Sequence, residues 1–249
     1  MSSPLHSFFS DLRLESGAFP CGGQQLSAPR AIWHPSPNFG ARRDGLTPQF
    51  VVLHYTAMTS ARAALERLCD PVAEVSAHYL IGGDGALWQM VAEDQRAWHA
   101  GAGEWCGLDD INSRSIGIEL DNRGDHPFAA RQMDVLEELL KGIFERWSLD
   151  GSAVIGHSDM APGRKVDPGP RFDWERLERQ GLAMRRGVDM GPRDPSFDSW
   201  RELARDIGYT SPVADEVLLE AVRLRFRPWV RGPLEPEDYT PIGHTALWT

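Results

Sequence analysis

The segment from Gly156 to Pro170, GHSDMAPGRKVDPGP, constrains this chain most, because it combines turn-forming residues with potential metal ligands. Its prolines and glycines disfavour regular secondary structure, so the sequence predicts an ordered loop without helix or strand. His157 and Asp167 lie in this loop and are residue types that bind zinc. Ordered loops commonly carry functional residues. We therefore expect a functional site here.

His54 is the third candidate ligand. It follows the apolar run 50–53, which is typical of a buried strand that delivers its last side chain to a sheet edge. A catalytic zinc ion usually has three protein ligands and one open position, and two histidines with one carboxylate suit hydrolysis. Each residue also has an ordinary interpretation. A histidine after a strand can be a hydrogen-bonded core residue, and Asp167 before a proline can begin a turn.

A further acidic candidate lies in the segment 115–120, SIGIEL, whose alternation predicts a strand. The three aliphatic residues of this strand share one face. Glu119 is the only ionisable side chain on the other face, which is otherwise small and forms a shallow floor for a substrate. The ordinary interpretation of Glu119 is an exposed residue at a solvated strand end.

The wider pattern predicts an α/β fold with a central mixed β-sheet flanked by helices. The strands are expected over residues 50–54, 77–82, 86–91, 115–120 and 153–156. Gly83–Gly85 predicts a hairpin turn between two of them. An apolar stripe at helical spacing predicts a helix over 129–147.

The chain is expected to have four parts. The division is an irregular N-terminal segment (1–30), a main domain (31–185), a linker (186–195) and a small C-terminal helical domain (196–249). In the last part, one helix should end at Gly208 and another should precede Pro228.

Composition limits the partners. With 26 basic and 36 acidic residues, the net charge of −10 argues against nucleic acid or an anionic membrane as a partner. No membrane span or signal-peptide-like apolar run is expected. Three dispersed cysteines fit reduced thiols, so we favour a cytoplasmic location, while a removed leader would allow a periplasmic one.

Five motifs together resemble the type 2 N-acetylmuramoyl-L-alanine amidases. They occur in the family's order, and the resemblance covers about residues 30–182. The motifs are His54–Thr56, Ser76–Ile81, Ala97–Gly101, Asn112–Leu120, and the segment from Gly156 to Trp174.

The resemblance implies a zinc hydrolase of peptidoglycan. The family cuts the amide between the lactyl group of N-acetylmuramic acid, or its 1,6-anhydro form, and L-alanine. By resemblance, His54, His157 and Asp167 are the zinc ligands. Glu119 corresponds to the general base, and Lys165 to the lysine that stabilises the transition state. In this mechanism zinc activates water and Glu119 takes the proton.

Other residues are candidates for substrate binding. Arg164 could bind a carboxylate of the stem peptide, or it could pair with a surface acid. Trp98 and His99 could form an aromatic wall, although packing is the ordinary role of tryptophan. We expect a structural role for His78, in contact with the metal ligands.

The segment Val222–Pro228 resembles part of a small helical peptidoglycan-binding domain. The alternative is a helical cap that only stabilises the main domain. The partners are then muropeptides or the intact sacculus.

Two other functions fit the sequence less well. A non-catalytic peptidoglycan-recognition module on the same fold is disfavoured, because no expected ligand or catalytic residue is replaced. A zinc peptidase is disfavoured by the absence of a His-Glu-x-x-His motif.

Overall fold

The computed structural model describes residues 31–188 and 191–243. The predicted N-terminal segment 1–30 lies outside the described residues, as do residues 189–190 of the predicted linker and 244–249 of the predicted helical domain.

A six-stranded mixed sheet forms the centre of the molecule, in the order β1-β5-β4-β7-β3-β8. β5 pairs antiparallel with β4, whereas the other neighbours are parallel. A separate antiparallel pair joins β2 and β6. The strands are β1 (Ile32–Trp33), β2 (Phe39–Ala41), β3 (Phe50–Tyr55), β4 (Tyr79–Ile81), β5 (Leu87–Gln89), β6 (Gln95–Ala97), β7 (Ser115–Leu120) and β8 (Val154–Gly156). The mixed sheet is confirmed, while β1, β2 and β6 were not predicted.

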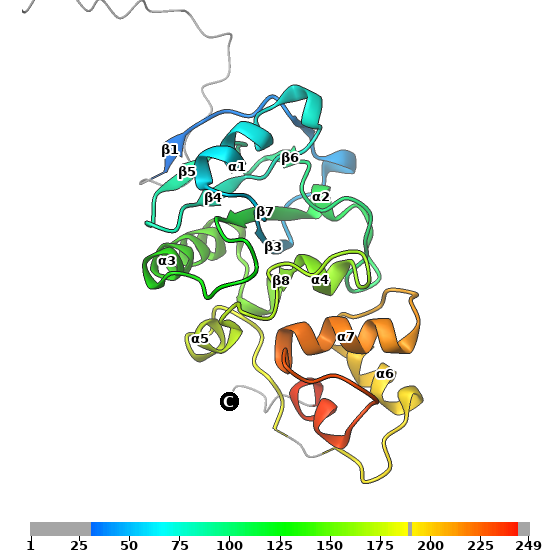
Figure 1. The fold of residues 1–249 in the computed structure, drawn as a ribbon. Coiled ribbons are helices and arrows are strands. Elements are labelled where there is room, and N and C mark those ends of the chain that lie inside the picture. The colour runs from blue at the N-terminus through cyan, green and yellow to red at the C-terminus, as the bar shows by residue number, and fades with distance from the viewer. Residues whose placement is uncertain (1–30, 189–190, 244–249) are drawn as a thin grey trace, which may run out of the picture.

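Helices flank the sheet, as the sequence predicts (Figure 1). They are α1 (Ala61–Leu68), α2 (Ile111–Arg114), α3 (Ala130–Trp147), α4 (His157–Met160), α5 (Trp174–Arg179), α6 (Phe197–Asp206) and α7 (Asp215–Phe226). The apolar stripe of α3 is buried, as its periodicity predicts. The sequence reasoning missed α1, α2 and α5.

One prediction was wrong: the segment that begins at Gly156 is not entirely irregular. Residues His157–Met160 form a single helical turn, α4. Its start is stabilised by Asp159, whose Oδ2 accepts a hydrogen bond of 2.7 Å from the Gly156 backbone N–H. The prolines of the segment begin only at Pro162, so they do not disturb this turn.

The two faces of the sheet are covered differently. α3 and α5 pack on one face, which receives Val51 and Leu53 of β3. Because side chains alternate along a strand, Val52 and His54 point to the opposite face. On that face, α1 packs over β4. A C-terminal helical unit, residues 197–243 with α6 and α7, packs over β3 and β8. The polar residues of the site lie between these two coverings.

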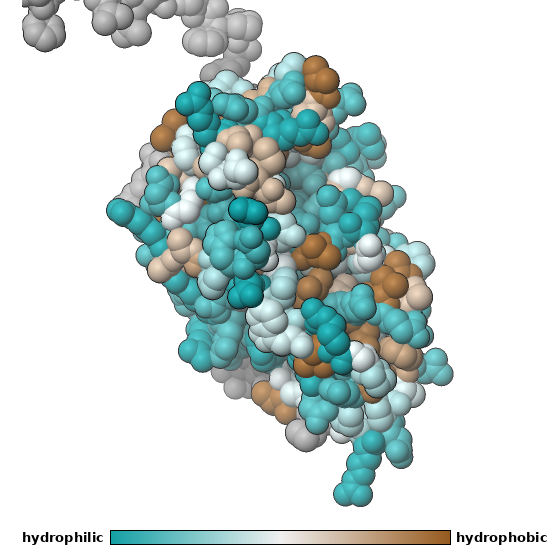
Figure 2. Space-filling model, in the orientation of Figure 1, coloured by the Kyte–Doolittle hydropathy of each residue, from teal (hydrophilic) through white to brown (hydrophobic). Residues whose placement is uncertain are grey.

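The C-terminal helices are part of the core rather than a loosely attached module. Trp200 of α6 and Leu218 of α7 share one apolar cluster with Val52 and Ile155 of the sheet and with Met160 of α4. On the face shown in Figure 2, hydrophobic spots gather around α4 and α7, within a largely hydrophilic surface. Both helices lie where the sequence predicts them. Among the described residues, no helix is long and apolar enough to span a membrane.

Candidate metal centre and active site

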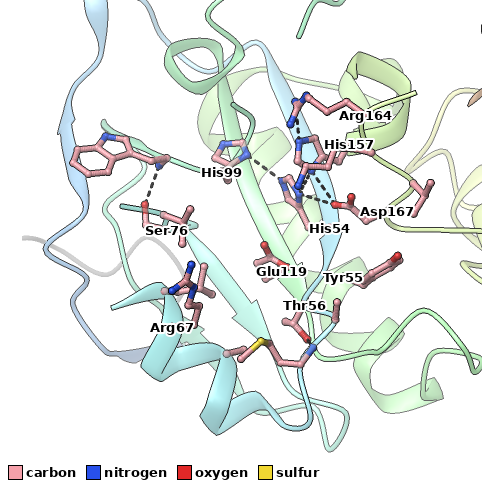
Figure 3. A pocket seen from close by; sticks show the side chains of 18 of the residues that line it. His54, Tyr55, Thr56, Arg67, Ser76, His99, Glu119, His157, Arg164 and Asp167 are labelled. Atoms are coloured by element: carbon pink, nitrogen blue, oxygen red, sulfur yellow. Dashed lines mark hydrogen bonds and ion pairs between the residues drawn. The ribbon is translucent and has the colours of Figure 1, made fainter. Parts of the chain in front are cut away.

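Three buried side chains converge at one edge of the sheet. His54 lies in β3, His157 begins α4 directly after β8, and Asp167 follows in the next loop. β3 and β8 are parallel neighbours, so their carboxyl ends meet at the same edge. The two Nδ1 atoms are 2.9 Å apart, and Asp167 Oδ2 is 2.9 Å from that of His54 and 3.0 Å from that of His157. Figure 3 shows this convergence.

The hydrogen bonds of His157 determine which of its nitrogens carries the proton. Its Nε2 lies 2.9 Å from the carbonyl oxygen of Ala100, which can only accept. Nε2 therefore carries a hydrogen, and Nδ1 is the nitrogen that faces Asp167 and His54.

A chain of hydrogen bonds determines the tautomer of His54 in the same way. Ser115 Oγ donates its proton to the carbonyl of Ile111 (2.6 Å), so it accepts from His99 Nε2 (3.2 Å). His99 Nδ1 then accepts from His54 Nε2 (3.0 Å), which leaves a lone pair on His54 Nδ1. Burial lowers the pKa of His54 to about 4 and that of His99 well below its usual value, so each ring is neutral at pH 7.

These hydrogen bonds leave three electron-donating atoms, the two Nδ1 atoms and Asp167 Oδ2, directed at one point. Two imidazole lone pairs and one carboxylate oxygen at such distances repel one another unless a cation lies between them. Two nitrogens and one oxygen are also a donor set that divalent transition metals prefer. The triad of His54, His157 and Asp167 could therefore hold a metal ion.

Glu119 lies beside this triad. It is directly opposite His54 in the pairing of β7 with β3. Its Oε2 is buried and has no hydrogen-bond partner among the described residues. Burial and the nearby Asp167 carboxylate raise the pKa of Glu119 to about 8, while the positive charge of Lys165 opposes this shift. Glu119 is thus an available proton acceptor or donor.

A cavity of about 430 Å³ opens over these groups. Lys165 and Trp98 line it, together with the triad and Glu119. Arg67 of α1 lies on the wall of the cavity opposite the triad (Figure 3). The cavity is within the size range of small-ligand sites in proteins.

The predicted substrate-binding residues lie at this cavity, with additional roles. The Arg164 guanidinium donates to the carbonyl of Ala100 (2.7 Å) and also to that of Ala102, and within the described chain it pairs with no acid. Trp98 is half-buried on the cavity wall. Both ring nitrogens of His99 are used by His54 and Ser115, so this side chain orients His54.

His78 has the structural role that the sequence predicts, but it does not touch the metal ligands directly. Its Nδ1 accepts from the Gly117 backbone N–H (2.9 Å), and its Nε2 faces the carbonyl of Gln95 (3.1 Å). The ring lies 5.8 Å from that of His99.

The sequence reasoning missed three residues. Arg67 was missed because no helix was predicted around it. The Asn112 side chain holds the segment that carries His99, because its Oδ1 accepts from the backbone N–H groups of His99 (3.0 Å) and Ala100 (2.8 Å). Ser115 was noted only as a small residue. Asn112 and Ser115 lie in one of the five motifs, which was the available signal.

Comparison with known proteins agrees with this site. The sequence profile of the N-acetylmuramoyl-L-alanine amidases matches residues 44–170, which include all three members of the triad and Glu119. The chain belongs to the N-acetylmuramoyl-L-alanine amidase family. The predicted family and the prediction of a hydrolase are confirmed.

Individual amidases are similar over much of their length. AmiD of Escherichia coli K12 is 35% identical over 208 residues, which cover 72% of this chain and 74% of AmiD. The crystal structure of AmpDh3 from Pseudomonas aeruginosa has a TM-score of 0.72 at 30% identity and covers 88% of this chain and 96% of AmpDh3. AmiD in complex with anhydro-N-acetylmuramic acid-L-Ala-D-gamma-Glu-L-Lys has a TM-score of 0.70 at 30% identity, covering 88% and 93%. The α/β fold prediction is confirmed.

Proposed function

We propose that this amidase uses zinc to hydrolyse the bond between the lactyl group of N-acetylmuramic acid, or its 1,6-anhydro form, and L-alanine. The observation that carries the proposal is the triad of His54, His157 and Asp167 beside the unpartnered carboxylate of Glu119 in one cavity. The muropeptide in the AmiD complex contains an anhydro-N-acetylmuramic acid to L-Ala junction and supports the same substrate class.

Zinc is the metal that best fits two imidazoles and one carboxylate, and its preference for four ligands leaves one position open. At such sites it supplies Lewis-acid activation of water and of an amide carbonyl. His54, His157 and Asp167 would be the ligands, with the two histidine Nδ1 atoms presenting their lone pairs.

Glu119 moves the proton. Its Oε2 accepts a proton from the attacking water as the bond from the water oxygen to the lactyl carbonyl carbon forms. It then returns this proton to the L-alanine nitrogen as the C–N bond breaks, so L-alanine leaves as an amine. Such general acid-base catalysis contributes about 10²- to 10⁴-fold.

Lys165 and the cavity walls act on the substrate. The Lys165 ammonium stabilises the negative charge that develops on the carbonyl oxygen. Arg67 and Arg164 lie on opposite walls of the cavity and offer cations to the carboxylates of a stem peptide. Trp98 provides an apolar surface on the wall of the same cavity.

The natural substrate is a peptidoglycan fragment or the sacculus. We favour soluble muropeptides and a cytoplasmic location, since Cys69 and Cys106 are free thiols, which persist in reducing compartments. Binding of the helical unit to peptidoglycan would instead favour the sacculus.

The experiment is mass spectrometry of soluble anhydro-muropeptides and of sacculi, each incubated with zinc-loaded and with chelator-treated protein. We expect free stem peptide only with zinc. The preferred substrate distinguishes recycling of fragments from remodelling of the wall. No product from either substrate at full zinc occupancy would favour a non-catalytic recognition module.

Substitutions can distinguish the proposed general base from the proposed zinc ligands. Glu119→Ala should retain zinc and lose about 10²-fold or more of the turnover rate. His157→Ala and Asp167→Ala should lose the metal as well. Zinc content measured after gel filtration decides between them, and equal zinc loss in all three variants would contradict the assigned roles.

A further inference from the structure

A buried carboxylate connects the helical unit to the metal-ligand segment. Asp159 lies in α4, two residues after His157. Its Oδ2 accepts hydrogen bonds from the Gly156 backbone N–H (2.7 Å) and from Arg225 Nη1 of α7 (2.8 Å), and its Oδ1 accepts from the hydroxyl of Tyr209 (2.6 Å). Tyr209 follows α6, so two of these three donors belong to the helical unit.

This cluster is inaccessible to solvent. The side chains of Arg225 and Asp159 are 1% and 0% exposed, and Tyr209 is 1% exposed. The Arg225 guanidinium also donates to the carbonyl of Val154 in β8 (3.2 Å) and stacks on the Trp174 ring, with its central carbon 4.1 Å from the ring centre. Water cannot readily replace the missing bonds if one member is removed.

The position of α4 affects two of the three metal ligands. His157 is its first residue, and the Ser158 backbone N–H donates to the carbonyl of Asp167 (2.9 Å). A helix of four residues has too few internal hydrogen bonds to be stable alone, so its position depends on tertiary contacts. Met160 supplies apolar contacts of this kind, and Asp159 supplies the polar ones, because each of its oxygens accepts a hydrogen bond from the helical unit.

We infer that the helical unit positions His157 and Asp167 for metal binding, through the bonds that Tyr209 and Arg225 make to Asp159. This inference rests on the proposed zinc site. It assigns Tyr209 and Arg225 as positioning residues that touch neither the metal nor the substrate. The helical unit then has a role in shaping the metal site, whatever else it binds.

The decisive variant is Tyr209→Phe, which removes one hydroxyl and keeps the aromatic ring that packs in the core. Its matched control is Tyr239→Phe. Tyr239 is also buried in the helical unit, at 4% exposure, and its hydroxyl bonds to the Ser196 carbonyl (2.6 Å) and to Ser199 Oγ (2.9 Å), not to Asp159. Both variants lose a buried phenol hydroxyl, but only Tyr209→Phe removes a hydrogen bond to the Asp159 carboxylate.

The primary measurement is the zinc dissociation constant of the full chain, obtained by competition with a chromophoric chelator. We expect the constant to rise about tenfold or more in Tyr209→Phe, the size of effect seen when groups that orient metal ligands are removed. It should stay within about twofold in Tyr239→Phe. The visible spectrum of the cobalt-substituted protein should change only in Tyr209→Phe, because it reports ligand geometry.

A second pair of variants tests the ionic half of the cluster. Arg225 and Arg223 both lie in α7, and Arg223 pairs with Asp238 inside the helical unit at 2.5 Å, with side chains 3% and 1% exposed. Arg225→Lys should weaken zinc binding, whereas Arg223→Lys should lower only the melting temperature of the metal-free protein. Where an arginine variant does not fold, the tyrosine pair decides.

The outcomes separate the inference from the proposed function. Zinc affinity and cobalt spectra unchanged in Tyr209→Phe, with only the melting temperature lowered, would overturn the inference and leave the cluster purely structural. Failure of the unmodified chain to bind zinc would contradict the proposed zinc site instead.

Discussion

At the scale of one residue, the position of Glu119 in its strand changes the pKa of its carboxyl group. β7 places this carboxyl opposite His54, where burial and Asp167 raise its pKa to about 8 from an ordinary value of 4.5. In the metal-free folded protein Glu119 is therefore protonated at neutral pH, whereas in the unfolded chain it is ionised.

This difference predicts how pH affects stability. Between about pH 4.5 and pH 8, the folded state binds the extra proton, so the free energy of unfolding of the metal-free protein falls as pH rises. Relative to Glu119→Gln, which has no such group, the unmodified chain should lose on the order of 3 kcal/mol from pH 5 to pH 8. Urea denaturation with a chelator present measures the free energy of unfolding at each pH. Glu145→Gln, on the exposed side of α3, is the control and should behave as the unmodified chain. Parallel pH profiles for all three proteins would contradict the raised pKa.

Lys165 provides a second prediction at this scale. Its ammonium should act on charge that exists only in the transition state, so Lys165→Met should lower kcat by about 10²-fold and change KM much less. Steady-state kinetics on an anhydro-muropeptide measure both. Lys141→Met, at an exposed position of α3, should have no effect. A large rise in KM with unchanged kcat would assign Lys165 to substrate binding instead.

At the scale of one element, β7 presents two small residues, Ser115 and Gly117, to the His99 ring that bonds to His54. A Cβ atom at Gly117 would lie 2.4 Å from Cγ of His99. Glycine at this position therefore leaves room for the His99 ring, which bonds to His54.

Gly117→Ala tests this arrangement. The added methyl should displace His99, weaken zinc binding about tenfold and lower the free energy of unfolding by about 1–3 kcal/mol. Gly40→Ala in β2 is the control, because nothing lies within 4 Å of a Cβ there. Competition for zinc and urea denaturation measure the two effects. Unchanged zinc affinity in Gly117→Ala would show that His99 does not support His54.

At the scale of the whole molecule, one apolar cluster joins the sheet to the helical unit, and the bonds to Asp159 cross the same boundary. We therefore expect a single unfolding transition. Scanning calorimetry should give a calorimetric enthalpy equal to the van't Hoff enthalpy, with the metal-free protein as the sample. Two separable transitions would show that the helical unit folds as an independent module.

The sequence by itself determined the features that depend on local pattern. Alternation predicts the strand that carries Glu119, and helical spacing predicts α3. Residue chemistry made His54, His157 and Asp167 candidate ligands, and the resemblance to a known family implied that they act together. These features are readable because each depends on residues that are close in the chain or on the nature of one side chain.

Only the tertiary structure decided which groups complete the site. Arg67 reaches the cavity because α1 packs over one end of the sheet face. The hydrogen-bond partners of the Asp159 side chain, Tyr209 and Arg225, lie 50 and 66 residues further along the chain. The tautomer of His54 likewise depends on His99 and Ser115, from other segments. Such contacts arise from how distant elements pack, and the periodicity of a single segment carries no information about the segment that will lie against it.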